Sequence, residues 1–169
     1  MRHVLLAAML ALSFAGLQAC QVKPLYSSQT GVTSSLASVG IKEVNDRVAQ
    51  ELRNQLIFLY SGGKGEPVKP DYTLNIAVAG TASAALREEL TDGITAQRYS
   101  ATVTFTLLDN RTKKVIGSGK RTVVTFYDQT TQEFANRRAL RDAENRAAHQ
   151  LAEIVRADTA SMISQQGTI

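Results

Sequence analysis

The sequence contains little cysteine and little histidine, and this shortage excludes several kinds of site. Cys20 is the single cysteine among 169 residues, so the chain cannot form an internal disulfide. The two histidines are His3, which lies in a predicted export signal, and His149. A cysteine–histidine nucleophile and a metal site built from cysteine and histidine are therefore excluded. We expect His149 to be a solvated residue on a helix.

The sequence also lacks an apolar run long enough to cross a bilayer. The uncharged run from Val4 to Leu17 is shorter than the roughly 20 residues that a membrane-spanning helix requires. Arg2 precedes this run, and small residues and a cysteine follow it, which is typical of an export signal. The whole chain is 44% apolar and 20% charged, an ordinary composition for one globular domain.

Cys20 stands where a bacterial lipoprotein carries its lipid. Leu17 lies three residues before it and Ala19 directly before it, as a lipoprotein signal peptidase requires. We predict that the thiol carries a diacylglycerol and that the freed amine carries a further acyl chain such as palmitate. Two or three chains hold a protein stably at a membrane, whereas one chain does not. The alternative is an ordinary secretory signal with a chance cysteine.

Composition divides the chain into three parts. Residues 1–19 are the predicted signal peptide. Residues 20–38 are rich in serine and threonine and show no sustained period, so they are predicted to be a lipidated N-terminus and tether. Residues 39–169 are predicted to form a single α+β domain.

The first half of this domain combines a short strand with a helix. Residues 35–44 show a short, β-branched, imperfect alternation that predicts a strand. Apolar residues at helical spacing over 48–60 predict a helix, with Asn45 or Asp46 as its N-terminal cap and Gly62 after its end.

The second half is predicted to contain three strands and a long helix. Alternation over 72–79 and 99–107 predicts an antiparallel hairpin, and a second hairpin leads into a strand over 115–127. An apolar stripe over 140–155 predicts the last helix. The fold class is therefore α+β, with two helices on one face of a four-stranded, mostly antiparallel sheet in the order strand-helix-strand-strand-strand-helix. The strand order stays open, and the helical crossover allows the first strand to run parallel to a neighbour.

Positive charge is concentrated around the second hairpin. The formal net charge of the chain is +4. The cations of residues 109–128 are Arg111, Lys113, Lys114, Lys120 and Arg121, against two aspartates. On a protein tethered to a membrane, such cations suit the phosphates of lipid or glycolipid head groups, and nucleic acid is not an expected partner. The alternative is that the lysines protect a sheet edge from aggregation.

Several short segments, in their order along the chain, resemble one known family. They are Cys20-Gln21-Val22-Lys23-Pro24-Leu25-Tyr26, Asp46-Arg47, Leu52-Arg53-Asn54, Arg98-Tyr99, Asp142-Ala143, Arg146-Ala147 and Leu151-Ala152. In this order the sequence is similar to the lipopolysaccharide-assembly lipoproteins of the LptE (RlpB) family, of the alphaproteobacterial type. The resemblance covers essentially the whole chain after the signal peptide.

The resemblance implies a fold, a location and partners. The implied fold has two helices and four strands, and the implied protein is a lipid-anchored, periplasm-facing component of the outer membrane. Its implied role is to plug the LptD-type β-barrel, to assist the assembly of that barrel and to contact lipopolysaccharide, without enzymatic turnover and without a cofactor. The candidate lipopolysaccharide contacts are Arg111, Lys113, Lys114, Arg98, Lys120 and Arg121.

Two other classes of function remain open at this point. One is another periplasmic accessory lipoprotein, such as an auxiliary subunit of a lipid-transporting ABC system or an activator of a peptidoglycan synthase. The other is a lipid-anchored hydrolase, which the shortage of histidine and cysteine disfavours.

Overall fold

The computed structural model describes residues 31–85 and 95–166. Cys20, the predicted signal peptide and the first part of the predicted tether lie outside these residues, as do Asp92 and Gly93 at the predicted tip of the first hairpin. The described elements in chain order are α2 (Val32–Ala37), β1 (Val39–Ile41), α3 (Arg47–Ser61), β2 (Tyr72–Ala84), β3 (Thr95–Asp109), β4 (Val115–Gln129) and α4 (Glu133–Gln166).

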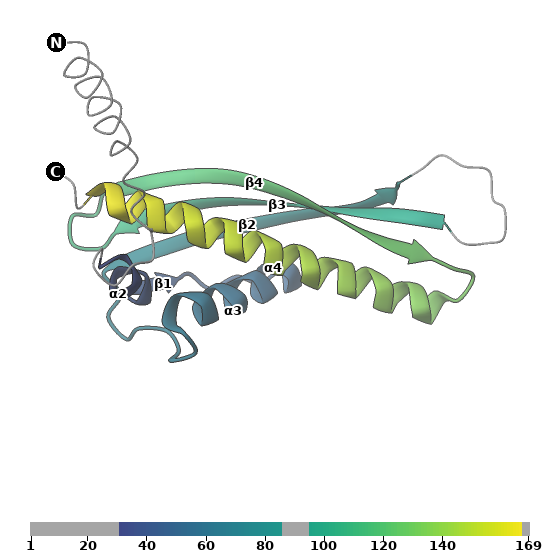
Figure 1. Cartoon of the computed structure of the whole chain (residues 1–169), viewed down its shortest axis with the longest axis horizontal. Coiled ribbons are helices and arrows are strands. Elements are labelled where there is room, and N and C mark those ends of the chain that lie inside the picture. Colours follow the sequence, from purple (N-terminus) through teal and green to yellow (C-terminus); the bar gives the residue numbers. More distant parts are fainter. Residues whose placement is uncertain (1–30, 86–94, 167–169) are drawn as a thin grey trace, which may run out of the picture.

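The four strands form one sheet in the order β1-β2-β3-β4. β1 runs parallel to β2, and the other neighbours are antiparallel. The molecule is elongated, with α4 lying along the sheet and α3 beside it on the same face (Figure 1). The predicted α+β class and element order are confirmed. The strand order, which the sequence left open, is resolved with the first strand parallel to its neighbour.

One helix was not predicted from the sequence. Residues 32–37, which composition placed in the tether, form α2, and its Val32 and Leu36 side chains are only 3% and 2% exposed. The strand predicted over 35–44 is shorter in the structure and spans only Val39–Ile41. Six residues are too few for a helical period to be recognisable in a sequence.

The boundaries of α3 follow directly from its sequence. Asp46 precedes the helix, and its carboxylate accepts hydrogen bonds from the backbone N–H groups of Val48 (2.9 Å) and Ala49 (3.0 Å). Gly62 follows the helix with φ of 62°, a left-handed conformation that glycine adopts without steric strain. Asp46 is one of the two caps that the sequence predicts, and Gly62 is at the predicted end of the helix.

The hydrophobic core lies between the helices and one face of the sheet. Val103, Phe105 and Leu107 of β3 point to this face and are 0%, 1% and 0% exposed. Leu52 of α3 and Leu151 of α4 lie over them and are fully buried. Alanines along the buried stripe of α4 allow this helix to pack closely on the sheet. None of the helices within the described residues is long and apolar enough to cross a membrane.

No helix of the described residues lies on the opposite face of the sheet, and we call this face the open face. The residues of β2, β3 and β4 that point to it are mostly small or hydroxyl-bearing, and Thr102 and Thr122 hydrogen-bond across two strands at 2.8 Å. By register the open face includes Ala77, Ala79, Thr81, Ser83, Arg98, Ser100, Thr102, Thr104, Thr106, Ser118, Lys120, Thr122, Val124 and Phe126.

Candidate functional site

Among residues 31–85 and 95–166, no group of three or more histidine, cysteine, aspartate or glutamate side chains is placed to hold a metal ion. His149, which the sequence predicts to be solvated, is about half exposed on α4, and its Nε2 lies 2.9 Å from Glu51 Oε1 of α3. This pair joins the two helices.

The β3–β4 turn is held by the carboxylate that begins it. Asp109 Oδ1 accepts hydrogen bonds from the backbone N–H groups of Arg111 (2.7 Å) and Thr112 (3.0 Å). These backbone donors hold the pKa of the Asp109 carboxyl below its usual value. The side chains of Arg111, Lys113 and Lys114 are exposed, and none of them forms an ion pair within the described part of the chain.

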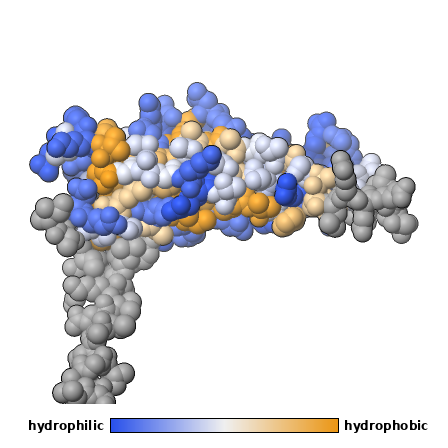
Figure 2. Space-filling view, turned by 90° about the horizontal axis from the view of Figure 1, so that it is seen from above, coloured by the Kyte–Doolittle hydropathy of each residue, from blue (hydrophilic) through white to orange (hydrophobic). Residues whose placement is uncertain are grey.

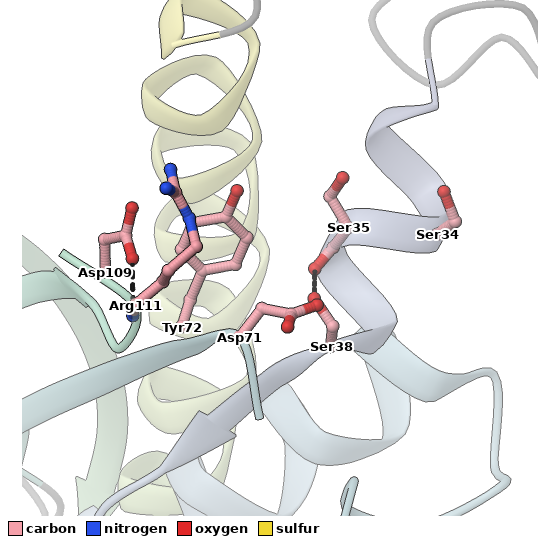
Figure 3. A pocket seen from close by; sticks show the side chains of 7 residues that line it. All are labelled: Ser34, Ser35, Ser38, Asp71, Tyr72, Asp109 and Arg111. Atoms are coloured by element: carbon pink, nitrogen blue, oxygen red, sulfur yellow. Dashed lines mark hydrogen bonds between the residues drawn. The ribbon is translucent and has the colours of Figure 1, made fainter. Parts of the chain in front are cut away.

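A polar pocket of about 360 Å³ lies between this turn and α2 (Figure 3). Ser34 and Ser35 of α2 and the C-terminal cap Ser38 line one side, and the start of β2 and the β3–β4 turn line the other. The lining residues are Ser34, Ser35, Ser38, Asp71, Tyr72, Asp109 and Arg111. The pocket shows that α2 and the turn belong to the same end of the molecule.

Lys120 and Arg121 point to opposite faces of the sheet, as adjacent residues of a strand must. Lys120 pairs in register with Thr104 and lies on the open face. Arg121 lies on the helix side, where its Nε and Nη2 donate to the carboxylate of Asp158 of α4 at 2.8 and 3.0 Å. These hydrogen bonds raise the pKa of the Arg121 guanidinium. Arg121 is therefore engaged within the fold.

Arg98 lies far from the turn. It is on the open face near the other end of β3, where its Nε donates to Ser83 Oγ at 3.3 Å. Asp109 lies eleven positions after Arg98 along β3, a distance of about 36 Å at about 3.3 Å per residue. The six candidate cations therefore do not form one site. They divide into the turn, the open face and the contact with α4.

The open face also carries apolar side chains that the sequence did not single out. Phe126, 60% exposed, pairs in register with Arg98, and Val124, 43% exposed, lies two residues before it in β4. Seen from above the view of Figure 1, hydrophobic and hydrophilic residues are intermingled on the surface of the described residues (Figure 2). Lys120, Val124 and Phe126 are an even number of positions apart along β4, so the alternation of side chains along a strand places them on the same face. The sequence could therefore have grouped them.

Comparison with known proteins gives a consistent result. The model of the LptE lipopolysaccharide-assembly family matches residues 34–159. No curated protein matches the chain by sequence.

Solved structures resemble the fold over most of its length. A candidate lipoprotein from Caulobacter crescentus CB15 is 26% identical, with a TM-score of 0.63, over 80% of this chain and 97% of that chain. Rare lipoprotein B from Shewanella oneidensis is 12% identical, with a TM-score of 0.57, over 76% of this chain and 96% of that chain. The latter similarity supports the fold alone. The family match covers well over half of the chain, which therefore belongs to the LptE family of lipopolysaccharide-assembly proteins.

Proposed function

We propose that the protein is an outer-membrane lipoprotein subunit of a lipopolysaccharide translocon, which plugs an LptD-type β-barrel, assists its assembly and contacts lipopolysaccharide during export. The observation that carries this proposal is membership of the LptE family over residues 34–159. The role is one of binding and support, without turnover.

The proposed anchor is Cys20. Its thiol and its freed amine carry the acyl chains that hold the protein at the outer membrane, facing the periplasm. Replacing it, Cys20→Ala, abolishes labelling by a palmitate analogue and releases the protein or blocks its processing. Persistent label on the variant would contradict this anchor.

The shape of the fold suits the lumen of a large barrel. The helix α4 has 34 residues, which corresponds to about 51 Å at about 1.5 Å per residue. This length exceeds the roughly 40–45 Å thickness of a bilayer with its head groups.

The test of the proposed function is purification of the native lipidated protein in detergent. Recovery of a stable complex with a large outer-membrane barrel supports the proposal, and recovery of an inner-membrane partner would contradict it.

We assign the contact with lipopolysaccharide to the open face. Arg98 and Lys120 offer cations to phosphates, and Phe126 and Val124 offer apolar surface on the same side of the sheet. A cationic and partly apolar surface suits a ligand that combines phosphates with acyl chains. The hydroxyl-rich remainder of the face suits the polar groups of a sugar.

The double variant Arg98→Gln/Lys120→Gln tests this assignment. It is expected to bind purified lipopolysaccharide more weakly, with a smaller dependence on salt, because two phosphate contacts are lost. The matched control is Arg121→Gln, which removes the neighbouring cation on the other face of β4 and is expected to leave binding unchanged. Equal losses in the double variant and in the control would contradict the open-face contact.

A further inference from the structure

The β3–β4 turn lies at the end of the molecule where the described chain begins (Figure 1). Gly31 leads directly into α2, which faces the turn across the polar pocket (Figure 3). Backbone hydrogen bonds hold this end together: Asn110 N–H donates to the Asp71 carbonyl, and Asp71 N–H donates to the Ser38 carbonyl, both at 2.9 Å. The chain that leads back to Cys20 therefore leaves the fold beside the turn.

This end carries an amphipathic surface, formed by residues 68–71 and 109–115, which we call the tether-end surface. Its charged residues are Lys69, Arg111, Lys113 and Lys114 against Asp71 and Asp109, and all except the half-buried Asp109 are exposed. It also exposes Val68 and Val115, which are 97% and 61% accessible. Excess positive charge beside exposed apolar side chains is the combination that binds anionic membrane surfaces.

Lys113 has a backbone conformation that indicates a role for its side chain. Its φ is 59°, and it is the one non-glycine residue with positive φ in the described ranges. Glycine or asparagine adopts this left-handed conformation at lower free energy, and glycine is common at such a position in hairpin turns. A lysine at this position stabilises the turn less than glycine would, which favours a function for its charge. Protection of the sheet edge does not explain it, because the turn lies beyond the paired strands.

The predicted anchor keeps this surface close to a membrane. Gly31 lies eleven positions after Cys20, and a chain of this length spans at most about 36–40 Å. Acyl chains in the leaflet therefore hold the tether-end surface at a high effective concentration near its head groups, so a weak contact is sufficient.

We propose that the tether-end surface rests on the anionic phospholipid head groups of the leaflet that holds the lipid anchor, and thereby orients the elongated fold relative to that membrane. The proposal rests on the proposed function in taking Cys20 as the anchor. The cations of the turn then meet phospholipid phosphates, while those of the open face meet lipopolysaccharide.

The test uses the mature chain from residue 20 with Cys20→Ser, so that no acyl chain contributes to binding. Flotation with vesicles of phosphatidylglycerol and phosphatidylcholine is compared with flotation with phosphatidylcholine alone. The expected result is binding to the anionic vesicles only, which weakens as salt is added. Equal binding to both kinds of vesicle would overturn the proposal. A protein that binds neither kind of vesicle at low salt would also overturn it.

Variants of the turn locate the contact. The triple variant Arg111→Gln/Lys113→Gly/Lys114→Gln is expected to lower vesicle partitioning about 100-fold, since each cation near an anionic surface contributes about five-fold. The single variant Lys113→Gly is expected to bind about five-fold more weakly while its thermal midpoint stays equal or rises. The matched control is Arg137→Gln/Arg138→Gln/Arg141→Gln, which removes three exposed cations near the N-terminus of α4, away from the turn (Figure 1). It is expected to bind the vesicles as strongly as the unsubstituted chain.

Two results would overturn the proposal at this stage. One is an equal loss in the control triple, which would show that net charge alone drives binding. The other concerns the binding of the triple turn variant to purified lipopolysaccharide. If this binding falls by as much as its binding to phosphatidylglycerol vesicles, or by more, the turn is a lipopolysaccharide contact. Neither measurement requires the barrel or the acyl chains, so failure here leaves the translocon proposal standing. Failure of the complex to copurify likewise leaves the vesicle result standing.

Discussion

The two faces of the sheet differ although they alternate along the same strands. On β3, Val103 and Phe105 lie beneath the helices and are 0% and 1% exposed. Thr102 and Thr104, which alternate with them, point away from the helices to the open face. Threonine keeps the strand preference of a β-branched residue while it presents a hydroxyl to water. One face therefore holds the fold together, and the other remains available for contact without becoming a large apolar patch.

The largest expected effect comes from a truncation on the helix face. Phe105→Ala is expected to lower the free energy of unfolding by about 3–5 kcal/mol, because it leaves a cavity among fully buried neighbours. The adjacent open-face variant Thr104→Ala is expected to change it by less than about 0.5 kcal/mol. Urea denaturation followed by circular dichroism measures both, and equal effects would show that the faces are misassigned.

A second expected effect comes from adding atoms to the helix face. A Cβ on Gly119 would lie 2.5 Å from Phe105 Cζ, so Gly119→Ala forces the ring to move. We expect a loss of about 1–3 kcal/mol in unfolding free energy. Ser118→Ala, one residue away on the open face, serves as the control and is expected to be near neutral. A stable Gly119→Ala variant would mean that the ring has room to shift.

A smaller effect separates two adjacent cations of β4. Arg121→Gln removes the paired hydrogen bonds to Asp158 and is expected to destabilise the fold slightly at low salt, because the pair is exposed to solvent. Lys120→Gln, on the open face, is expected to leave stability unchanged. Thermal melts at low and high salt measure the difference, which shrinks as salt is added. A larger loss for Lys120→Gln would reverse the assignment.

The smallest effect concerns alkaline pH. Burial, followed by the nearby carboxylates of Glu144 and Asp46, raises the pKa of the Tyr99 phenol above its usual 10.0. The folded chain therefore keeps a proton that the unfolded chain loses above about pH 10. Stability from this group is complete below that pH and falls as pH rises beyond it. Tyr99→Phe is expected to lose less stability between neutral and alkaline pH than the parent, and parallel pH profiles of the two would contradict this.

Most of the fold could be predicted because its elements are periodic. Asp46 and Gly62 mark the ends of α3, and the alternation along β3 decides which residues are buried. The helix α2 could not be predicted, because six residues show no period, and its burial depends on contacts with α3 and α4. The strand predicted over 35–44 is longer than β1, because three residues are likewise too few to show a period.

The grouping of the candidate cations was only partly predictable. The length of the strand between Arg98 and Arg111 already separates them, and the alternation already places Lys120 and Arg121 on different faces. The engagement of Arg121 by Asp158 could not be predicted, because it depends on how α4 lies across β4. The left-handed backbone of Lys113 is likewise a property of the turn and not of its composition.

The most direct test of the open-face contact is photo-crosslinking in cells during lipopolysaccharide export. A photoreactive amino acid is placed at Thr104 on the open face and, in a separate strain, at the exposed Gln150 of α4 on the helix side. The account predicts lipopolysaccharide adducts at position 104 and none at position 150. Adducts at position 150 without adducts at position 104, in a protein that still assembles with its barrel, would contradict it.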